Sequence, residues 1–381
     1  MPENNFNIQK VNTITEFVSL INDSLQSDNK NYYYRGENEY FDYRTPSLYL
    51  EESLVYLGSE YYYRTLIKEM GDEVLLNNVE LTRQLAERQH YGAKTRILDI
   101  TTNPLVALFF AVDIDNDKDG YVYIYEEENQ KEKFDSGHTI AIKTALNFID
   151  QKVINNFLSY MDFAEKLDKQ SKSFDISESQ TTDDIISKFS NNMQFDLIRS
   201  CIDDGKKYSE GDDGLYYVVG EKNFGYYPED IDCYKSLSQN EREHFNDILN
   251  SDYLSNFMEL LNQRAMVKEK LIYPYKIYKD LKKAHIVFIS KSTERIKQQQ
   301  GAFIYPCFVN TMDKDFENIK SEINDSIKKK SNSLIIKIKS EMKKTIRKEL
   351  RKFGITEGYI YPDIQHKSKD ILEVLKDEYN K

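Results

Sequence analysis

The chain of 381 residues lacks tryptophan and has few of the residues that cross-link a fold or interrupt its elements, with three cysteines and seven prolines. Cys201, Cys233 and Cys307 lie far apart and form no CxxC pair, which argues against a zinc knuckle or a disulfide framework and fits a reducing cytoplasm. No apolar run approaches the ~20 residues that span a bilayer, and the first residues lack the pattern of a signal peptide. We therefore expect a cytoplasmic protein without a membrane partner.

Positive charge is also in deficit: the chain has 52 Lys and Arg residues against 64 Asp and Glu residues, which gives a net charge of −12. This balance argues against a general nucleic-acid coat and leaves open a local basic patch. The lysine-rich stretch 328–352 is expected to be a solvated helix face, with a phosphate-binding patch as the alternative. Aromatic residues are abundant instead, with 29 Tyr and 20 Phe, and we expect tyrosines both in the core and on the surface.

The segment 81–113 is the most informative part of the chain. Leu81 and Leu85 lie one helical turn apart, and Gly92 supplies a residue that tolerates positive φ after a helix end. Residues 96–100 alternate like a half-buried strand, and 105–112 form an apolar helix that Asn103 caps. Between these core elements the sequence places polar side chains that form either a structural network or a functional site: Gln89, His90, Tyr91, Thr95, Arg96, Asp99, Thr101 and Asn103.

Periodicity elsewhere predicts the remaining elements. Helices are expected over 14–26, 50–80, 341–352 and 367–378, and strands over 32–34, 121–125, 285–289, 301–304 and 333–339. We expect an α+β fold with a mixed, mostly antiparallel sheet core surrounded by helices. Residues 126–262 show no catalytic pattern, so we interpret them as an insertion or subdomain that interrupts one discontinuous domain, 1–125 and 263–381.

Several short motifs occur in a fixed order along the chain. They are Tyr34-Arg35-Gly36, Thr45-Pro46-Ser47-Leu48, Gln89-His90-Tyr91-Gly92, Thr95-Arg96-Ile97-Leu98-Asp99, the run Asn103–Ala111, Arg295-Ile296 with Gln300-Gly301-Ala302-Phe303, and Tyr361-Pro362-Asp363. In order and spacing these motifs resemble the FRG domain family, which is named for its aromatic-Arg-Gly motif. The resemblance spans about residues 32–125 and 270–378, and it departs at Tyr34, where Phe is usual, and at Ile100, where Trp is common.

This resemblance implies an intracellular bacterial or phage-encoded protein, because several members are placed with anti-phage defence or toxin functions. A weaker likeness is to ADP-ribosyltransferases, whose sites combine an early strand arginine, a middle Ser/Thr strand and a late Glu or Gln. Arg35, residues 99–102 and Gln299/Gln300 stand here in that order. The likeness implies NAD as co-substrate, a nucleic acid or protein as acceptor, and no metal.

The likeness also assigns roles. An arginine fork suits a pyrophosphate because it is planar and permanently charged, and tyrosine faces stack on nicotinamide or adenine. A Gln in the last position is weaker than a Glu, so Asp99 or His90 would have to compensate. The expected catalytic residues are Arg35, His90, Asp99 and Gln300, and the expected NAD-binding residues are Tyr34, Gly36, Gln89, Tyr91, Arg96 and Thr101.

Structural roles and other functions are the alternatives. Arg35 could pair with a core carboxylate, and Arg96 and Asp99 could form a mutual buried ion pair. The same cluster also fits a sensor module that recognises a nucleotide or a phage component without chemistry. A third hypothesis is a metal-independent nuclease, with His90 as general base and Arg96 as phosphate clamp. The oligomeric state is left open.

Overall fold

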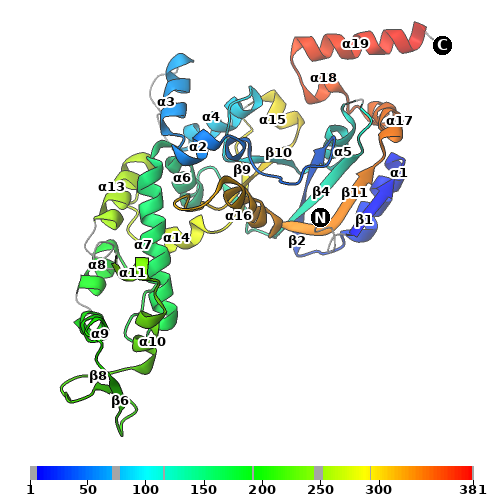
Figure 1. Cartoon of the computed structure of the whole chain (residues 1–381). Coiled ribbons are helices and arrows are strands. Elements are labelled where there is room, and N and C mark those ends of the chain that lie inside the picture. The colour runs from blue at the N-terminus through cyan, green and yellow to red at the C-terminus, as the bar shows by residue number, and fades with distance from the viewer. Residues whose placement is uncertain are drawn as a thin grey trace.

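A computed structural model of the chain describes residues 7–70, 78–114, 116–190, 193–243, 252–291 and 293–379. Its centre is an eight-stranded sheet in the order β1-β11-β4-β2-β3-β10-β9-β5 (Figure 1). The pairs β1–β11 and β5–β9 are parallel and the other pairs are antiparallel, which confirms the predicted α+β class. The strands are β1 (Asn7–Val11), β2 (Lys30–Glu37), β3 (Leu98–Thr101), β4 (Gly120–Glu128), β5 (Lys133–Phe134), β9 (His285–Phe288), β10 (Gly301–Tyr305) and β11 (Ser331–Ile338).

Helices cover both faces of the sheet, because its strands alternate apolar side chains between the two sides. One face packs on α1 (Ile14–Ser24), α5 (Pro104–Val112) and α17 (Ser340–Lys352). The other face packs on the helices around α16. These are the 3-10 helix η1 (Ser47–Leu50), α2 (Glu52–Tyr56), α3 (Glu60–Glu69), α4 (Asn78–His90) and α16 (Phe316–Lys328).

The segment 126–262 is largely helical and forms an arm that Figure 1 shows extending along α7 to a small sheet at its tip. Its apolar core is continuous with the sheet through Phe303 and Tyr305 of β10. The separation of the chain into domains stays a prediction. The arm and its base contain α6 (His138–Ala145), η2 (Leu146–Phe148), α7 (Gln151–Gln170), α8 (Thr182–Ser190), α9 (Met193–Asp203), β6 (Tyr208–Glu210), β7 (Tyr216–Val218), β8 (Gly225–Tyr226), α10 (Pro228–Ser236), α11 (Gln239–Glu243), α13 (Tyr253–Ala265) and α14 (Pro274–Leu281).

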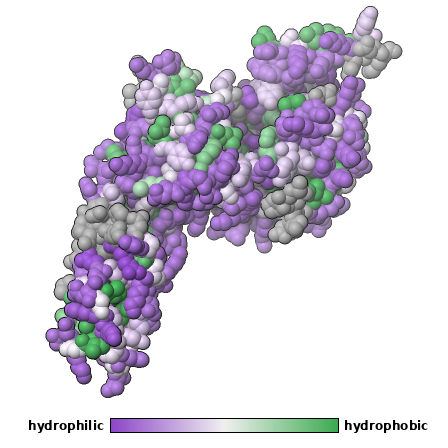
Figure 2. Space-filling model, viewed as in Figure 1, coloured by the Kyte–Doolittle hydropathy of each residue, from purple (hydrophilic) through white to green (hydrophobic). Residues whose placement is uncertain are grey.

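The C-terminal part completes the fold with α15 (Glu294–Gln298), α18 (Glu357–Ile360) and α19 (Ile364–Tyr379). The helix expected over 50–80 is divided into α2, α3 and the start of α4, and residues 71–77 lie outside the described chain. In the view of Figure 2, hydrophilic residues predominate on the surface. No helix in the described ranges is both long enough and apolar enough to cross a membrane.

The contact between β2 and α5 fixes the middle of the sheet. Asn103 accepts a hydrogen bond from the Leu105 amide and Pro104 begins the helix, as the sequence predicts. A Cβ on Gly36 would lie 1.8 Å from the Ala107 carbonyl oxygen, so only glycine lets the helix backbone approach this strand. The apolar helix is therefore buried directly against the strand that carries Arg35.

Candidate functional site

Arg35 lies where the two halves of the sheet meet. Successive side chains of β2 point to opposite faces, so Arg35 shares the α16 face with Tyr33, while Tyr34 packs on the α5 face. The strands β2 and β3 are paired only at Tyr34 and Thr101. The side chain of Arg35 bridges the two strands next to this single pair.

Two of the three guanidinium nitrogens of Arg35 have partners. Nε donates to Glu37 Oε1 at 2.8 Å, and Nη1 donates to the Asp99 carbonyl oxygen at 2.8 Å. Nη2 makes no hydrogen bond with any residue that the structure describes. The Arg35 side chain is 26% exposed and that of Glu37 only 5%. Arg35 therefore presents one free edge of its fork from a largely buried position.

Electrostatics keeps this arginine charged. Burial is the largest single influence and would lower the pKa of Arg35, but the charge of Glu37, the nearby Tyr125, the hydrogen bond to Glu37 and the charge of Asp99 together outweigh it, so the pKa is raised. Nearby, burial raises the pKa of Tyr125 to about 12, so its hydroxyl stays protonated. The site thus combines a permanent cation with neutral phenols.

A hydrogen-bonded chain orients the carboxylate of Asp99. Gln89 Nε2 donates to Asp99 Oδ2 at 2.5 Å, and the Thr95 hydroxyl donates to Gln89 Oε1. Because the hydroxyl fixes the amide oxygen, the amide nitrogen must face Asp99. The second oxygen of Asp99 and the second oxygen of Glu37 are buried and have no hydrogen-bond partner within the described ranges. Each of these two carboxylates is thus left with one oxygen that has no donor.

Thr101 ends β3, and Gln300 directly precedes β10. The Thr101 hydroxyl donates to the Gln299 carbonyl at 2.7 Å, and the Thr102 amide donates to the Gln300 carbonyl at 3.1 Å. Gln300 has φ +46° where α15 turns into β10. The register aligns Tyr34, Thr101 and Gly301 in one row. Gln300 is therefore separated from β2 by β3, and its side chain is not hydrogen-bonded to Arg35.

Arg96 corrects one expectation. It forms no ion pair with Asp99 in the part of the chain that the structure describes, so the predicted mutual pair is wrong. Its side chain is 4% exposed and donates to Asn147 Oδ1 at 3.1 Å, to the Tyr49 hydroxyl at 3.2 Å and to Ser59 Oγ at 3.4 Å. Arg96 thus anchors η1 and η2 to the loop before β3, away from the Arg35 cluster.

The remaining expected residues are not gathered at this cluster. Tyr34 is 6% exposed on the α5 face, and Gly36 is occupied by the close approach of α5. Tyr91 is 83% exposed just beyond α4, next to Gly92, whose positive φ ends the helix as predicted. The side chain of His90 lies outside the described residues.

Sequence reasoning missed two participants. Glu37 stands two residues after Arg35 on the same strand, so the period-two alternation of β2 could have placed both on one face. Thr95 belongs to the predicted polar cluster, but the sequence assigns it no role, because its partner Gln89 lies on a helix whose orientation depends on tertiary packing.

Residues 30–120 match the family model of the FRG domain. The chain contains an FRG domain. The matched part of the FRG domain runs from β2 to the first residue of β4 and includes Arg35, Glu37, Gln89 and Asp99. Gln300 lies outside the match. No curated protein and no solved structure matches the chain.

Proposed function

We propose that the FRG domain of this chain carries an NAD-consuming, ADP-ribosyltransferase-like site, and that the protein acts inside a bacterial cell as an anti-phage defence or toxin effector. The observation that supports this most directly is the free edge of the Arg35 guanidinium, which is bonded to the Glu37 carboxylate and the Asp99 carbonyl, together with one buried oxygen on each of the Glu37 and Asp99 carboxylates that has no donor. This combination binds an anion at one edge and stabilises a cation at the other.

The chemistry needs both charges. Nicotinamide leaves NAD when the bond between its ring nitrogen and the ribose C1′ breaks, and the bonding electron pair goes to the ring nitrogen. The ribose then carries positive charge in an oxocarbenium-like state, which an acceptor nucleophile captures while giving its proton to a base. Carboxylate oxygens near C1′ lower the energy of that state by charge. Arg35 Nη2 would hold the pyrophosphate at the other edge.

The roles of the other residues follow from their contacts. Gln89 orients the Asp99 carboxylate, and Thr95 orients Gln89, so these two are positioning residues. Asp99 is the proposed stabiliser of the developing cation, because one oxygen of its carboxylate has no donor. Gln300 and His90 stay proposed contributors on the acceptor side, and a nucleic acid or protein stays the proposed acceptor.

Nicotinamide release by the full chain is the direct test. The wild type is incubated with NAD, nicotinamide is quantified by chromatography, and candidate acceptors are analysed by mass spectrometry for added ADP-ribose. Arg35→Gln is expected to lower kcat/KM by about 10²-fold or more, in line with the loss of one preorganised donor. Arg64→Gln removes an exposed arginine with a 2.8 Å glutamate partner and is the matched control, with unchanged turnover.

A second measurement, made in cells, tests the case in which the activity requires a cellular trigger. Expression of the wild type in bacteria should deplete cellular NAD and arrest growth, and Asp99→Asn should relieve both at equal protein level. Intact growth and intact NAD during phage challenge, together with no product in vitro, would contradict the proposal.

The second candidate is the sensor hypothesis, in which the cluster binds a nucleotide without chemistry. It is favoured by the ion pair between Arg35 and Glu37, because a guanidinium already paired with a carboxylate can still bind a ligand through its free edge. It predicts saturable nucleotide binding that Arg35→Gln weakens, without any product. The nuclease hypothesis has lost its proposed phosphate clamp, since the donors of Arg96 are directed to Asn147, Tyr49 and Ser59.

A further inference from the structure

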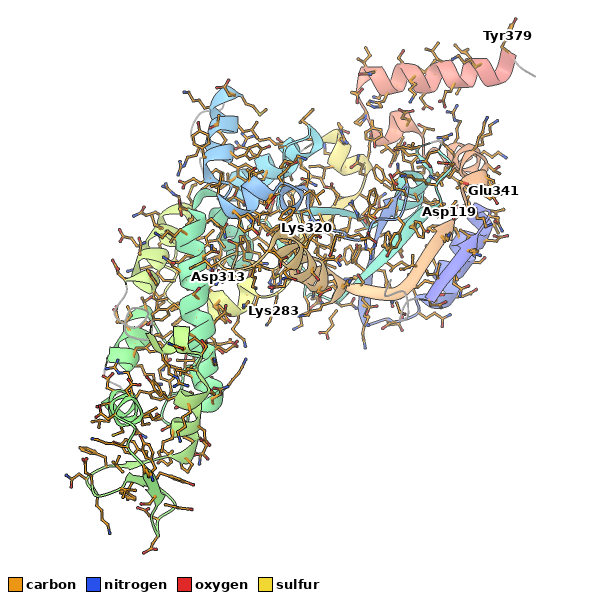
Figure 3. All side chains as sticks on the ribbon, viewed as in Figure 1. Asp119, Lys283, Asp313, Lys320, Glu341 and Tyr379 are labelled. Carbon is orange, nitrogen blue, oxygen red and sulfur yellow. The ribbon has the colours of Figure 1, made fainter. Side chains whose placement is uncertain are left out.

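A pocket lies on the α16 face of the sheet, and its lining includes none of Arg35, Glu37 and Asp99. Its volume is about 230 Å³. The outer strands supply its floor through Ile8, Tyr121 and Ile335, and α16 supplies one wall. The loop between β2 and η1 closes the other side. Lys320, labelled in Figure 3, marks α16 at this wall.

Three tyrosines line this pocket: Tyr40, Tyr43 and Tyr121. Tyr40 meets Tyr121 edge to face at 5.7 Å between ring centroids. Lys320 Nζ lies 5.0 Å from the centroid of Tyr43, another lining residue. Rings of this kind give flat, electron-rich walls on which a planar heterocycle can stack.

The hydrogen-bond donors of this pocket indicate the kind of ligand more specifically than its aromatic walls do. Arg44 is 7% exposed, and its guanidinium carbon lies 4.0 Å above the ring of Tyr123. It forms no ion pair with any described carboxylate, and its side chain makes one hydrogen bond, to the Phe41 carbonyl at 3.3 Å. An arginine this deeply buried without a carboxylate is costly unless an anion joins it.

Asn324 provides the independent observation. Its side chain is 2% exposed, and Oδ1 accepts from the Arg44 backbone amide at 3.1 Å. Its Nδ2 group has no partner among the residues that the structure describes, although Asn324 lines the pocket. Lys328, one helical turn later, adds an ammonium group that also contacts Asp325 at 3.2 Å. The lining includes one opposing carboxylate, the exposed Asp42.

We propose that this pocket binds a nucleoside monophosphate, with the base against the tyrosines and the phosphate on Arg44, Asn324 and Lys328. A fork, an amide and an ammonium suit a tetrahedral phosphate with several acceptor oxygens better than a flat carboxylate. The volume is below the roughly 300–1,000 Å³ of pockets for larger ligands. The pocket therefore suits one small nucleotide with a single phosphate group, and it shares no lining residue with the proposed NAD site.

Calorimetric titration of the full chain with AMP tests this proposal. Asn324→Asp keeps the side-chain volume and the acceptor for the Arg44 amide, but it replaces the free donor by a negative charge. It is expected to weaken AMP binding by at least about tenfold, since a charged hydrogen bond becomes a repulsion. Lys328→Gln should weaken binding by a smaller factor and reduce its dependence on salt. Asn318→Asp, an exposed position on the same helix, is the matched control.

Comparison of ligands and a second variant separates the outcomes. AMP should bind more tightly than both adenosine and inorganic phosphate, and Arg35→Gln should leave AMP binding unchanged even where it abolishes nicotinamide release. No AMP binding by the wild type, inorganic phosphate binding as tightly as AMP, or equal affinity of Asn324→Asp and the wild type would each overturn the proposal. A thermal unfolding curve for Asn324→Asp verifies that the variant is folded.

Discussion

The pair formed by Arg35 and Glu37 allows a stability prediction that is independent of any activity. Glu37 is 5% exposed, one of its oxygens is held by Arg35 and the other has no partner. Arg35→Gln therefore leaves a buried carboxylate without a counter-charge. Removing one member of a buried pair costs about 3–5 kcal/mol, and the 26% exposure of Arg35 brings our expectation to about 2–4 kcal/mol.

Substitution of the other partner, Glu37→Gln, is expected to lower the free energy of unfolding by less. In Glu37→Gln the amide oxygen can still accept from Arg35 Nε, and the guanidinium can turn its charge toward solvent, so we expect a loss of about 1–2 kcal/mol. In the double variant neither charge remains, so its loss should fall short of the sum of the two single losses by about 1–3 kcal/mol.

Urea denaturation of the four proteins measures this coupling energy. Arg64 and Glu60 form the control pair, since their atoms also approach to 2.8 Å but their side chains are 46% and 31% exposed. Their coupling should be about 0.3–0.5 kcal/mol, as for other exposed pairs one helical turn apart. A coupling between Arg35 and Glu37 no larger than that of the control pair would refute the account of the site as a buried charge cluster. The double variant should also regain stability without regaining NAD turnover.

Three further predictions concern packing, pH dependence and the arm. Gly36→Ala should destabilise the chain by about 3 kcal/mol or more, because its Cβ would lie 1.8 Å from the Ala107 oxygen, whereas Gly92→Ala, with φ +94° in open space, should cost about 1 kcal/mol; thermal unfolding compares the two. Burial lowers the pKa of Lys143 to about 7 from an ordinary value of 10.5, while the Lys283 and Pro306 carbonyls, at 2.7 and 2.6 Å, favour its charged form. Between these pKa values the unfolded chain binds a proton that the folded chain lacks, so the free energy of unfolding should rise by up to about 2 kcal/mol from pH 7 to pH 9. Urea midpoints of Lys143→Met should lack this rise. An identical rise in both proteins would contradict the assignment. Asp230 is fully buried and accepts from the Ser171 hydroxyl, the Lys172 amide and the Gln194 side chain. Asp230→Asn should therefore lower the free energy of unfolding by about 2–3 kcal/mol. If the arm is a separate unit, limited proteolysis of this variant should cut within 126–262 first.

The elements themselves were predictable where the physics is local. Asn103 followed by Pro104 specifies a helix start, Gly92 specifies a helix end, and the β-prone run around Tyr123 specifies a strand. Each depends on residues within one or two turns of chain, so the sequence contains the whole cause. The order of the motifs was likewise sufficient to predict the FRG domain.

The partners of the buried charges were not predictable in this way. Arg35 contacts the carbonyl of a residue 64 positions away, and Arg44 contacts Asn324 across 280 positions. Such contacts depend on strand order and register, which sequence periodicity does not contain.

The residues alone were sufficient to predict the class of fold and the family of the domain, because hydrophobic period and capping act over short distances. The contacts of Arg35 with Glu37 and the Asp99 carbonyl, and of Arg96 with Asn147, follow from the packing of the folded chain. The physical reason is that a buried charge takes the nearest acceptor in space, and which acceptor is nearest is set by how the sheet and helices pack together.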